Sequence, residues 1–283
     1  MQLPAVIEYL NESTLSATPL ARDAPRPDIA ASSPVSAQFS QVRISSTFQP
    51  VVARRDQRVI GYEALLRGTV AGQPVSAETI FAETRDPEAR VTLDRLCRAV
   101  HTLNFIAQDA QGLLFLNVHP DLLATVPNHH GEVFEQMLRI CHFPTRRVVL
   151  EIPADAIDEG RLRNAVRSYH RHGYRVALTH LGRQPAPLLA AHELSPEMVK
   201  LDPALVAEAL RNRPTRNHLL RLIEMLHTLV GTEVAIEGVE TRGESRLAED
   251  IGADLVQGFY YQRPHPAPAP LLDTMPVRTL GFA

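Results

Sequence analysis

From Phe39 onward, the chain alternates short apolar runs with longer stretches of helical period. Runs that are apolar almost throughout are typical of strands buried on both faces, as in a parallel sheet. Eight such runs occur: SSTFQPVVA (45–53), VIGYEALLR (59–67), LLFLNVHP (113–120), VVLEIP (148–153), RVALTH (175–180), MVKLD (198–202), EVAIEGV (233–239) and DLVQGFYY (254–261). Eight strands separated by helices predict an α/β fold, a TIM-like (β/α)8 barrel.

The stretches between these runs have the spacing of helices with one apolar face. Apolar residues recur every three or four positions, which is the period of a helix that packs one side against a core. Two sets show it most clearly: Leu93, Leu96, Val100 and Leu103, and then Leu219, Leu222, Ile223, Leu226 and Val230. These helices are expected to cover the outside of the barrel.

The N-terminal part of the chain differs in composition. Residues 11–38 are rich in Ser, Ala, Pro and Thr and have no sustained periodicity, which favours a flexible arm. We therefore expect an arm over 1–43 and one barrel domain over 44–283. A chain of 283 residues with 45% hydrophobic content is large enough for that single core.

Charge and cysteine content exclude several classes of function. The formal net charge of −3 gives no general attraction for nucleic acid or anionic lipid. Cys97 and Cys141 show neither a disulfide framework nor metal spacing. No stretch approaches the roughly 20 apolar residues that cross a bilayer. The expectation is a cytoplasmic protein with no membrane span and no nucleic-acid partner.

Polar residues interrupt the ends of the apolar runs, where barrel enzymes place their chemistry. Singly, such a residue is more often a helix cap or a solvated loop residue than a ligand. Together they are expected to converge on one pocket, where carboxylate and amide oxygens suit a hard cation such as Mg²⁺ or Mn²⁺. The residues are Glu63, Asn117, Glu151, Thr179, His180, Lys200, Glu237 and Gln257.

These motifs resemble those of EAL domains, named after the tripeptide that stands here as Glu63-Ala64-Leu65. The resemblance runs over about 44–275 through FQPVVARRDQRVIGYEALLRG, LFLNVHP, LEIP, MVKLD, AIEGVET and ADLVQGFYYQRP, in that order. It implies an EAL-type barrel from a bacterial signalling family. That family hydrolyses cyclic di-GMP to linear pGpG with two divalent metal ions that activate a water molecule.

The resemblance also assigns roles to individual positions. Metal ligands would be Glu63, Asn117, Glu151 and Glu237, and Lys200 and Glu237 would take the catalytic positions. Gln49, Gln257 and Arg263 would lie along the bound nucleotide. Arg67 would meet a phosphate, because a guanidinium fits a phosphate bidentately. The alternative for Arg67 is an ordinary surface arginine after a strand.

Three positions depart from the family pattern. Thr179 and His180 stand where the family has two aspartates, the first of which bridges the metals. Ala154 stands where the family has a glutamate that anchors the loop after the fifth of the eight strands, RVALTH (175–180). His180 could ligate a transition metal or serve as a structural histidine. Because three linked carboxylates are replaced, we do not expect efficient hydrolysis.

Three interpretations follow from this mixture of retained and lost residues. The preferred one is a catalytically impaired sensor that binds cyclic di-GMP and passes its occupancy to an unknown protein partner. The second is a nucleotide-independent interaction module, in which Lys200 pairs with Glu237 or Glu151 and holds the barrel mouth together. The third is a residual metal-dependent phosphodiesterase. The family resemblance also allows a homodimer.

Overall fold

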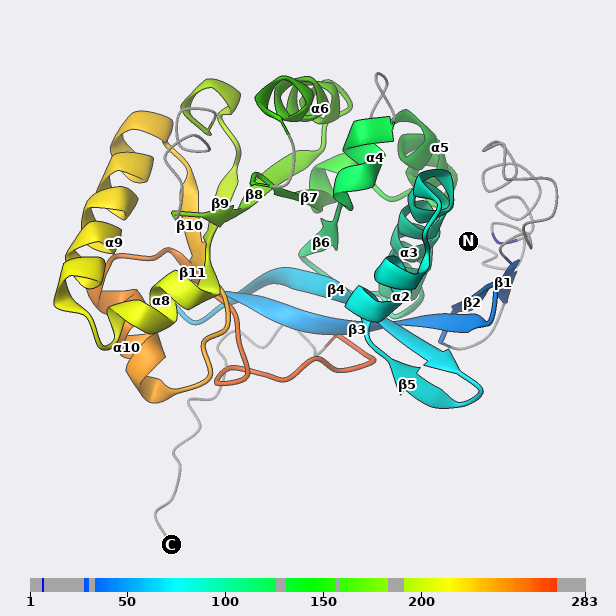
Figure 1. Cartoon of the computed structure of the whole chain (residues 1–283), viewed down its shortest axis with the longest axis horizontal. Helices are drawn as coiled ribbons and strands as arrows, with labels where there is room; N and C mark the ends of the chain where they lie inside the picture. Colours follow the sequence, from blue (N-terminus) through cyan, green and yellow to red (C-terminus); the bar gives the residue numbers. More distant parts are fainter. Residues whose placement is uncertain are drawn as a thin grey trace, which may run out of the picture.

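The computed structural model describes residue 7 and residues 28–30, 34–125, 131–155, 158–182 and 191–268. Eight strands close into a barrel, in the spatial order β3, β11, β10, β9, β8, β7, β6, β4 and back to β3 (Figure 1). Their bounds are β3 (Val42–Ala53), β4 (Val59–Val70), β6 (Leu113–Asn117), β7 (Val148–Pro153), β8 (Arg175–Leu181), β9 (Met198–Leu201), β10 (Glu233–Ile236) and β11 (Leu255–Val256). The predicted TIM-like barrel is confirmed, and each apolar run supplies one of its strands.

One strand departs from the all-parallel pattern. β3 pairs antiparallel with both of its neighbours, β4 and β11, whereas the other barrel pairs are parallel. The reason is the connection, because residues 54–58 are too few for the crossover that parallel strands need. The expectation of a wholly parallel sheet was therefore wrong at β3.

The sheet continues beyond the barrel along the long hairpin of β3 and β4. On one side β2 (Ser36–Phe39) pairs with β3, and β1 (Asp28–Ala30) pairs with β2; on the other β5 (Gln73–Val75) pairs with β4 (Figure 1). These residues include part of the predicted arm, so the expected boundary at residue 44 falls inside the sheet. The rest of the predicted arm, and residues 269–283 of the predicted barrel domain, lie outside the described residues.

Helices surround the barrel, as Figure 1 shows. Their starts follow from local capping: Asp86 accepts hydrogen bonds from the backbone of Glu88 and Ala89 at the start of α3, and Thr241 and Glu244 form a capping box at α10. The helices are α2 (Ala77–Glu83), α3 (Pro87–Ala107), α4 (Pro120–Thr125), α5 (Glu132–Ile140), α6 (Glu159–Arg171), α8 (Pro203–Ala209), α9 (Arg213–Met225) and α10 (Arg242–Asp250), with a 3₁₀ turn η2 (Thr145–Arg147) and a π turn η3 (Leu226–Val230). Among the described residues, no helix is long and apolar enough to span a membrane.

The core has two parts. The larger part fills the space between the sheet and the helices. The smaller part closes the barrel interior, and nearly every barrel strand contributes one residue to it: Val51, Phe115, Val149, Ala177, Met198, Ala235 and Leu255. Because strand side chains alternate, the residue two positions further toward the barrel mouth faces the same interior.

Gly258, just after β11, is a position where the backbone excludes any side chain. A Cβ atom there would lie 2.0 Å from the carbonyl oxygen of Val239. We expect Gly258→Ala to lower the free energy of unfolding by about 1–3 kcal/mol, as overpacking does, measured by urea unfolding. The control is Gly243→Ala in α10, where the nearest atom is 3.7 Å away and stability should be retained. Equal stability of the two variants would contradict this close packing.

Candidate functional site

A ring of polar side chains lies directly above the apolar interior of the barrel. Each barrel strand, or the residue directly after it, contributes one member of the ring. Seven members lie two positions along the chain from the interior residue of the same strand, and Glu63 lies two positions from Gly61. On β3, which runs the opposite way, the ring residue comes two positions before its interior neighbour. The members are Gln49, Glu63, Asn117, Glu151, Thr179, Lys200, Glu237 and Gln257. The structure thus brings the polar strand-end residues together, with Thr179 in the same ring.

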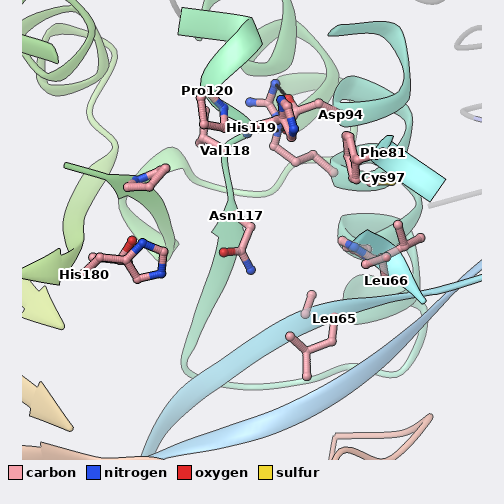
Figure 2. Close-up of a pocket in the computed structure, with 16 residues that line it drawn as sticks. Leu65, Leu66, Phe81, Asp94, Cys97, Asn117, Val118, His119, Pro120 and His180 are labelled. Carbon is pink, nitrogen blue, oxygen red and sulfur yellow. Dashed lines mark hydrogen bonds and ion pairs between the residues drawn. The ribbon is translucent and has the colours of Figure 1, made fainter. Parts of the chain in front are cut away.

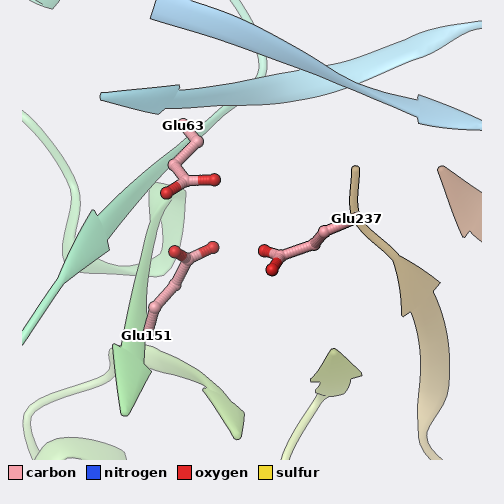
Figure 3. Close-up of side chains that lie close together, drawn as sticks. All are labelled: Glu63, Glu151 and Glu237. Carbon is pink, nitrogen blue, oxygen red and sulfur yellow. The ribbon is translucent and has the colours of Figure 1, made fainter. Parts of the chain in front are cut away.

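Three carboxylates of this ring converge. Ligand oxygens of Glu63, Glu151 and Glu237 all lie within 4.8 Å of one another, as Figure 3 shows. They come from β4, β7 and the end of β10, so the closure of the barrel holds them at this separation. Glu63 and Glu151 are buried and Glu237 is partly exposed. Buried carboxylates this close require positive charge nearby.

Lys200 supplies positive charge from within the chain. Its side chain is fully buried, and its Nζ lies 2.5 Å from Glu151 Oε1, 2.5 Å from Glu237 Oε1 and 3.1 Å from Glu63 Oε2. The two pairings named in the interaction-module hypothesis are therefore present. Of the 29 Lys and Arg residues, Lys200 is the only lysine. A compact ammonium fits between three carboxylates, whereas a planar guanidinium would not. Lys200 was expected at this site, and its being the only lysine of the chain is a further signal in the sequence that was not used.

The electrostatics differ from one carboxylate to the next. Burial opposes the charged form of Glu63, but Lys200 and hydrogen bonds from Asn117 and Gln257 outweigh it, so the pKa of Glu63 is lowered. Burial and the charge of Glu63 raise the pKa of Glu151 well above its usual value, despite Lys200. Burial also works against the ammonium of Lys200, yet the three carboxylates raise its pKa well above the usual value. One ammonium thus leaves the three carboxylates short of positive charge.

Amide side chains fix the orientation of Glu63. Asn117 Nδ2 donates to Glu63 Oε1 at 2.8 Å, and Gln257 Nε2 donates to Glu63 Oε2 at 2.7 Å. Gln257 also donates to Gln49 Oε1 at 3.2 Å, and Gln49 donates to the backbone oxygen of Gln262. The hydrogen bonds connect β3, β4, β6 and the end of β11. Half of the eight residues expected to bind metal or nucleotide belong to this network, namely Gln49, Glu63, Asn117 and Gln257.

The donor set fits one hard divalent cation. Three carboxylates and the Asn117 amide oxygen are the ligand types that Mg²⁺ and Mn²⁺ prefer. Glu151 Oε1 is buried and is paired with Lys200 Nζ at 2.5 Å. A divalent cation bound at this oxygen would take over part of the charge that Lys200 now balances. The residues that could hold one cation are Glu63, Asn117, Glu151 and Glu237.

A second cation finds a poorer environment. Thr179, at the β8 position of the ring, is buried and offers a neutral hydroxyl. The imidazole of His180 is half exposed, and its Nδ1 lies 3.3 Å from Asp155 Oδ1. The backbone of His180 has a positive φ of 62°. Ala154 is buried in the apolar core, and its backbone N–H donates to the oxygen of Thr179. The three departures therefore lie together on β7 and β8 and offer no carboxylate toward the ring.

The two arginines expected at the nucleotide lie at the rim. Arg67 is exposed and lies four residues beyond Glu63 on β4, which places both on the same face of the strand. Its guanidinium donates to the backbone oxygen of Leu66 at 2.9 Å. Arg263 is exposed, with its guanidinium 4.4 Å from the ring centre of Phe259. Neither arginine takes part in the hydrogen bonds of the ring among the described residues.

A pocket of about 300 Å³ opens beside the ring, between α2, α3, β4 and β6 (Figure 2). Asn117 and Thr179 belong to both the ring and the pocket wall. Buried polar residues of α3, namely Asp94, Arg98 and His101, line it as well. The apolar spacing of α3 predicted a helix from the sequence. The polar residues Asp94, Arg98 and His101 recur at i, i+4 and i+7 on the same helix, and this signal was not used.

The comparison with known families decides the identity of the domain. The model of the EAL domain family matches residues 34–264. The chain belongs to the EAL domain family. The match begins before residue 44, in agreement with the strand β2 found there.

Relatives and solved structures agree with this assignment. The uncharacterised EAL-domain protein YkuI of Bacillus subtilis is 25% identical over 223 residues, 77% of this chain and 54% of YkuI. The probable cyclic di-GMP phosphodiesterase PdeN of Escherichia coli is 27% identical over 236 residues, 77% of this chain and 43% of PdeN. This EAL chain spans about half the length of these two relatives.

Among solved structures, that of YkuI in complex with cyclic di-GMP and calcium has a TM-score of 0.67 and 26% identity, covering 80% of this chain and 57% of YkuI. The FimX EAL domain of Xanthomonas citri, in complex with cyclic di-GMP, has a TM-score of 0.70 and 17% identity, covering 94% and 95% of the two chains. The likeness to FimX supports the fold alone.

Removing Lys200 should test the charge balance of the ring. We expect Lys200→Met to lower the free energy of unfolding by about 3–5 kcal/mol, because it leaves buried carboxylates without their ammonium. Millimolar Mn²⁺ should raise the melting temperature of this variant more than that of the wild type, because a cation can replace the ammonium. Lys200→Arg should also be destabilised, because the guanidinium does not fit.

The matched control is Arg58→Met, which removes a charge from the exposed turn at the opposite end of β4. Its melting temperature should stay close to that of the wild type. A Lys200→Met protein as stable as this control, with or without Mn²⁺, would show that the ring does not depend on the ammonium.

Proposed function

We propose that this EAL domain is a catalytically impaired, cytoplasmic receptor for cyclic di-GMP in bacterial second-messenger signalling, and that it reports its occupancy to a protein partner. The observation that carries the proposal is the composition of the ring. Seven of its eight positions keep carboxylate, amide or ammonium groups, and the eighth, on β8, is Thr179. Binding groups are thus kept while an anionic group is missing at one point.

Support for the ligand comes from two sides. YkuI, which is similar to this chain in sequence and structure, was solved in complex with cyclic di-GMP and calcium. In this chain, Arg67 lies on the same strand face as Glu63, where a phosphate bound at the mouth would meet its guanidinium. Gln49, Gln257 and Arg263 line the β3 and β11 side of the same opening.

Support for impaired hydrolysis comes from the electrostatics of two-metal sites. Two divalent cations about 4 Å apart repel strongly unless anionic oxygens lie between them. Thr179 has no charge, and His180 is paired with Asp155. A single cation at Glu63, Asn117, Glu151 and Glu237 would, when bound, polarise a phosphate oxygen of the ligand. It would leave the second half of a two-metal arrangement without a carboxylate.

Binding of the nucleotide can be measured by isothermal titration calorimetry of the wild type with cyclic di-GMP. We expect Arg67→Ala to weaken binding about 10- to 100-fold, because hydrogen bonds to a charged group contribute roughly 1.5–3 kcal/mol. Arg58→Ala, at the other end of β4, should bind as the wild type does. The absence of measurable heat from the wild type at high micromolar ligand would refute the receptor function.

Catalysis can be tested by restoring the missing carboxylates. The wild type with Mg²⁺ or Mn²⁺ should release little pGpG, and Thr179→Asp combined with His180→Asp should raise the rate by about 100-fold or more, because preorganised charge at the reacting centre has effects of that order. Adding Ala154→Glu tests the loop anchor separately. Activity should be followed by chromatography of the product.

The control for that gain is Glu63→Ala in the doubly substituted background, which should abolish product formation. If the wild type itself produces pGpG rapidly, and Glu63→Ala removes this activity, the domain is a working phosphodiesterase. That result would favour the third interpretation, a metal-dependent enzyme that manages without the two aspartates.

The ion pairs of Lys200 favour one alternative function. They balance part of the carboxylate charge from within the chain, so the barrel mouth can be held together without nucleotide or metal. In that case the domain would act as a nucleotide-independent interaction module, as a monomer or as a homodimer. A partner complex whose affinity does not change on adding saturating cyclic di-GMP would support this alternative over the receptor.

A further inference from the structure

A second cavity lies at the turn between α8 and α9, among the helices outside the barrel. It encloses about 470 Å³ and is called here the α8–α9 pocket. Figure 1 shows these two helices beside α10, on the other side of the barrel from α2 and α3. The pocket shares no residue with the ring or with the pocket next to the ring. Its lining residues are Ala209, Leu210, Arg211, Arg213, Arg216 and Asn217.

Positive charge is concentrated at the α8–α9 pocket. Residues 209–223 contain four arginines and no acidic residue, although the whole chain has a formal net charge of −3. Three of these arginines line the pocket, and one of them, Arg216, is paired with Asp250 at 2.5 Å. The side chains of Arg211 and Arg213 are exposed and make no ion pair or hydrogen bond with any residue that the structure describes. Two guanidinium groups are thus left to a partner from outside.

The acidic residue that precedes these arginines is already engaged. Glu208 Oε1 accepts hydrogen bonds from Asn212 Nδ2 at 3.1 Å and from Thr215 Oγ1 at 2.7 Å. The first turn of α9 contains no acidic residue, although acidic residues are favoured there by the partial positive charge of a helix start. Because guanidinium groups pair strongly with carboxylates, external carboxylates would be favoured at this surface.

Exposed leucines lie next to the basic groups. Leu210 lines the pocket and is 42% exposed, and Leu220 is 38% exposed. Leu220 follows Arg213 by seven positions and Arg216 by four, which places all three on one face of α9. Among the described residues, large apolar side chains are exposed at four positions, and two of these are here. Exposed apolar side chains next to arginines are typical of surfaces that bind another protein.

The helix α8 connects this surface to the barrel mouth. It begins directly after Asp202, whose backbone N–H donates to the oxygen of Leu181 at the end of β8. A Cβ atom at Gly238, the residue after Glu237, would lie 3.6 Å from Pro203, the first residue of α8. The seven residues of α8 span about 10 Å at 1.5 Å per residue. One end of α8 therefore lies beside the ring and the other at the α8–α9 pocket.

We propose that the α8–α9 pocket is a docking site for an acidic segment of a partner protein. Carboxylates of that segment pair with Arg211 and Arg213, and its apolar side chains pack on Leu210 and Leu220. In the proposed function, on which this assignment rests for its role, the segment belongs to the partner that receives the signal. Docking itself requires neither nucleotide nor metal, because no residue of the ring takes part in it.

The docking site can be tested with a fluorescein-labelled peptide of Glu and Asp that contains two leucines, added to the full chain at micromolar concentrations. We expect its fluorescence anisotropy to rise on binding. Arg211→Glu combined with Arg213→Glu should weaken the affinity about 10-fold or more, because repulsion replaces two exposed ion pairs. Added salt should also weaken binding, since exposed charges are screened.

The matched control is Arg167→Glu combined with Arg171→Glu, which makes the same change of charge at exposed positions of α6. It should bind the peptide as the wild type does. Leu210→Ser, or alanine in place of the peptide's leucines, should weaken binding by several-fold, because apolar burial is lost. Thermal melting checks that each variant is folded.

Three results would overturn the docking site. One is failure of the peptide to bind to the wild type, and another is an equal loss of affinity in both double variants. The third is a change of oligomeric state: if light scattering shows a wild-type dimer that Arg211→Glu with Arg213→Glu converts to a monomer, the surface contacts a second copy of the chain. Full binding of the leucine-free peptide would likewise refute it, as an effect of charge alone.

Failure of the docking site is distinguishable from failure of the receptor function, because the peptide is titrated without nucleotide. If the peptide binds as expected and calorimetry detects no binding of cyclic di-GMP, the docking site stands and the receptor function falls. If cyclic di-GMP binds and the peptide does not, the receptor function stands and the docking site is refuted.

Discussion

A buried ammonium facing three carboxylates is the interaction on which the barrel mouth depends. Lys200 is enclosed completely, and three different strands or strand ends bring Glu63, Glu151 and Glu237 to it. Unpaired charges at such a depth would be strongly destabilising, so these four residues constrain one another. The negative charge that holds Lys200 in place also gives the cluster the ligand types that a divalent cation prefers. The packing of the barrel mouth and its ligand chemistry therefore depend on the same four residues.

The ring is asymmetric in the charge and polarity of its two sides. On the side of β3, β4, β6 and β11, amides orient Glu63 and two arginines stand at the rim. On the side of β7 and β8, Thr179 and Ala154 are uncharged and His180 is paired with Asp155. The first side carries carboxylate, amide and guanidinium groups, and the three residues of the second side carry no carboxylate. Asn117 and Thr179, one from each side, both line the pocket between α2, α3, β4 and β6.

Much of the fold could be predicted from the sequence because strand and helix periodicities are local. The eight apolar runs correspond to the eight barrel strands, and the strand-end polar residues face one opening. Two errors also have local causes. The five residues 54–58 between the first two runs could have indicated an antiparallel hairpin. The strand β2 escaped notice because it has only four residues and lies in a stretch rich in small residues. The expected boundary at residue 44 therefore falls inside the sheet.

By itself, the sequence determined the barrel, its family and the polar residues at the strand ends. The tertiary structure decided which side chains meet: that Lys200 contacts all three glutamates, that His180 turns to Asp155, and that Asp94 is paired with Arg98. It also brought His101 Nδ1 to within 2.7 Å of Ser46 Oγ, and Ser46 to Asn104. The physical reason is that periodicity sets which face a residue occupies, whereas hydrogen bonds and ion pairs depend on the stagger of strands and helices distant in the chain.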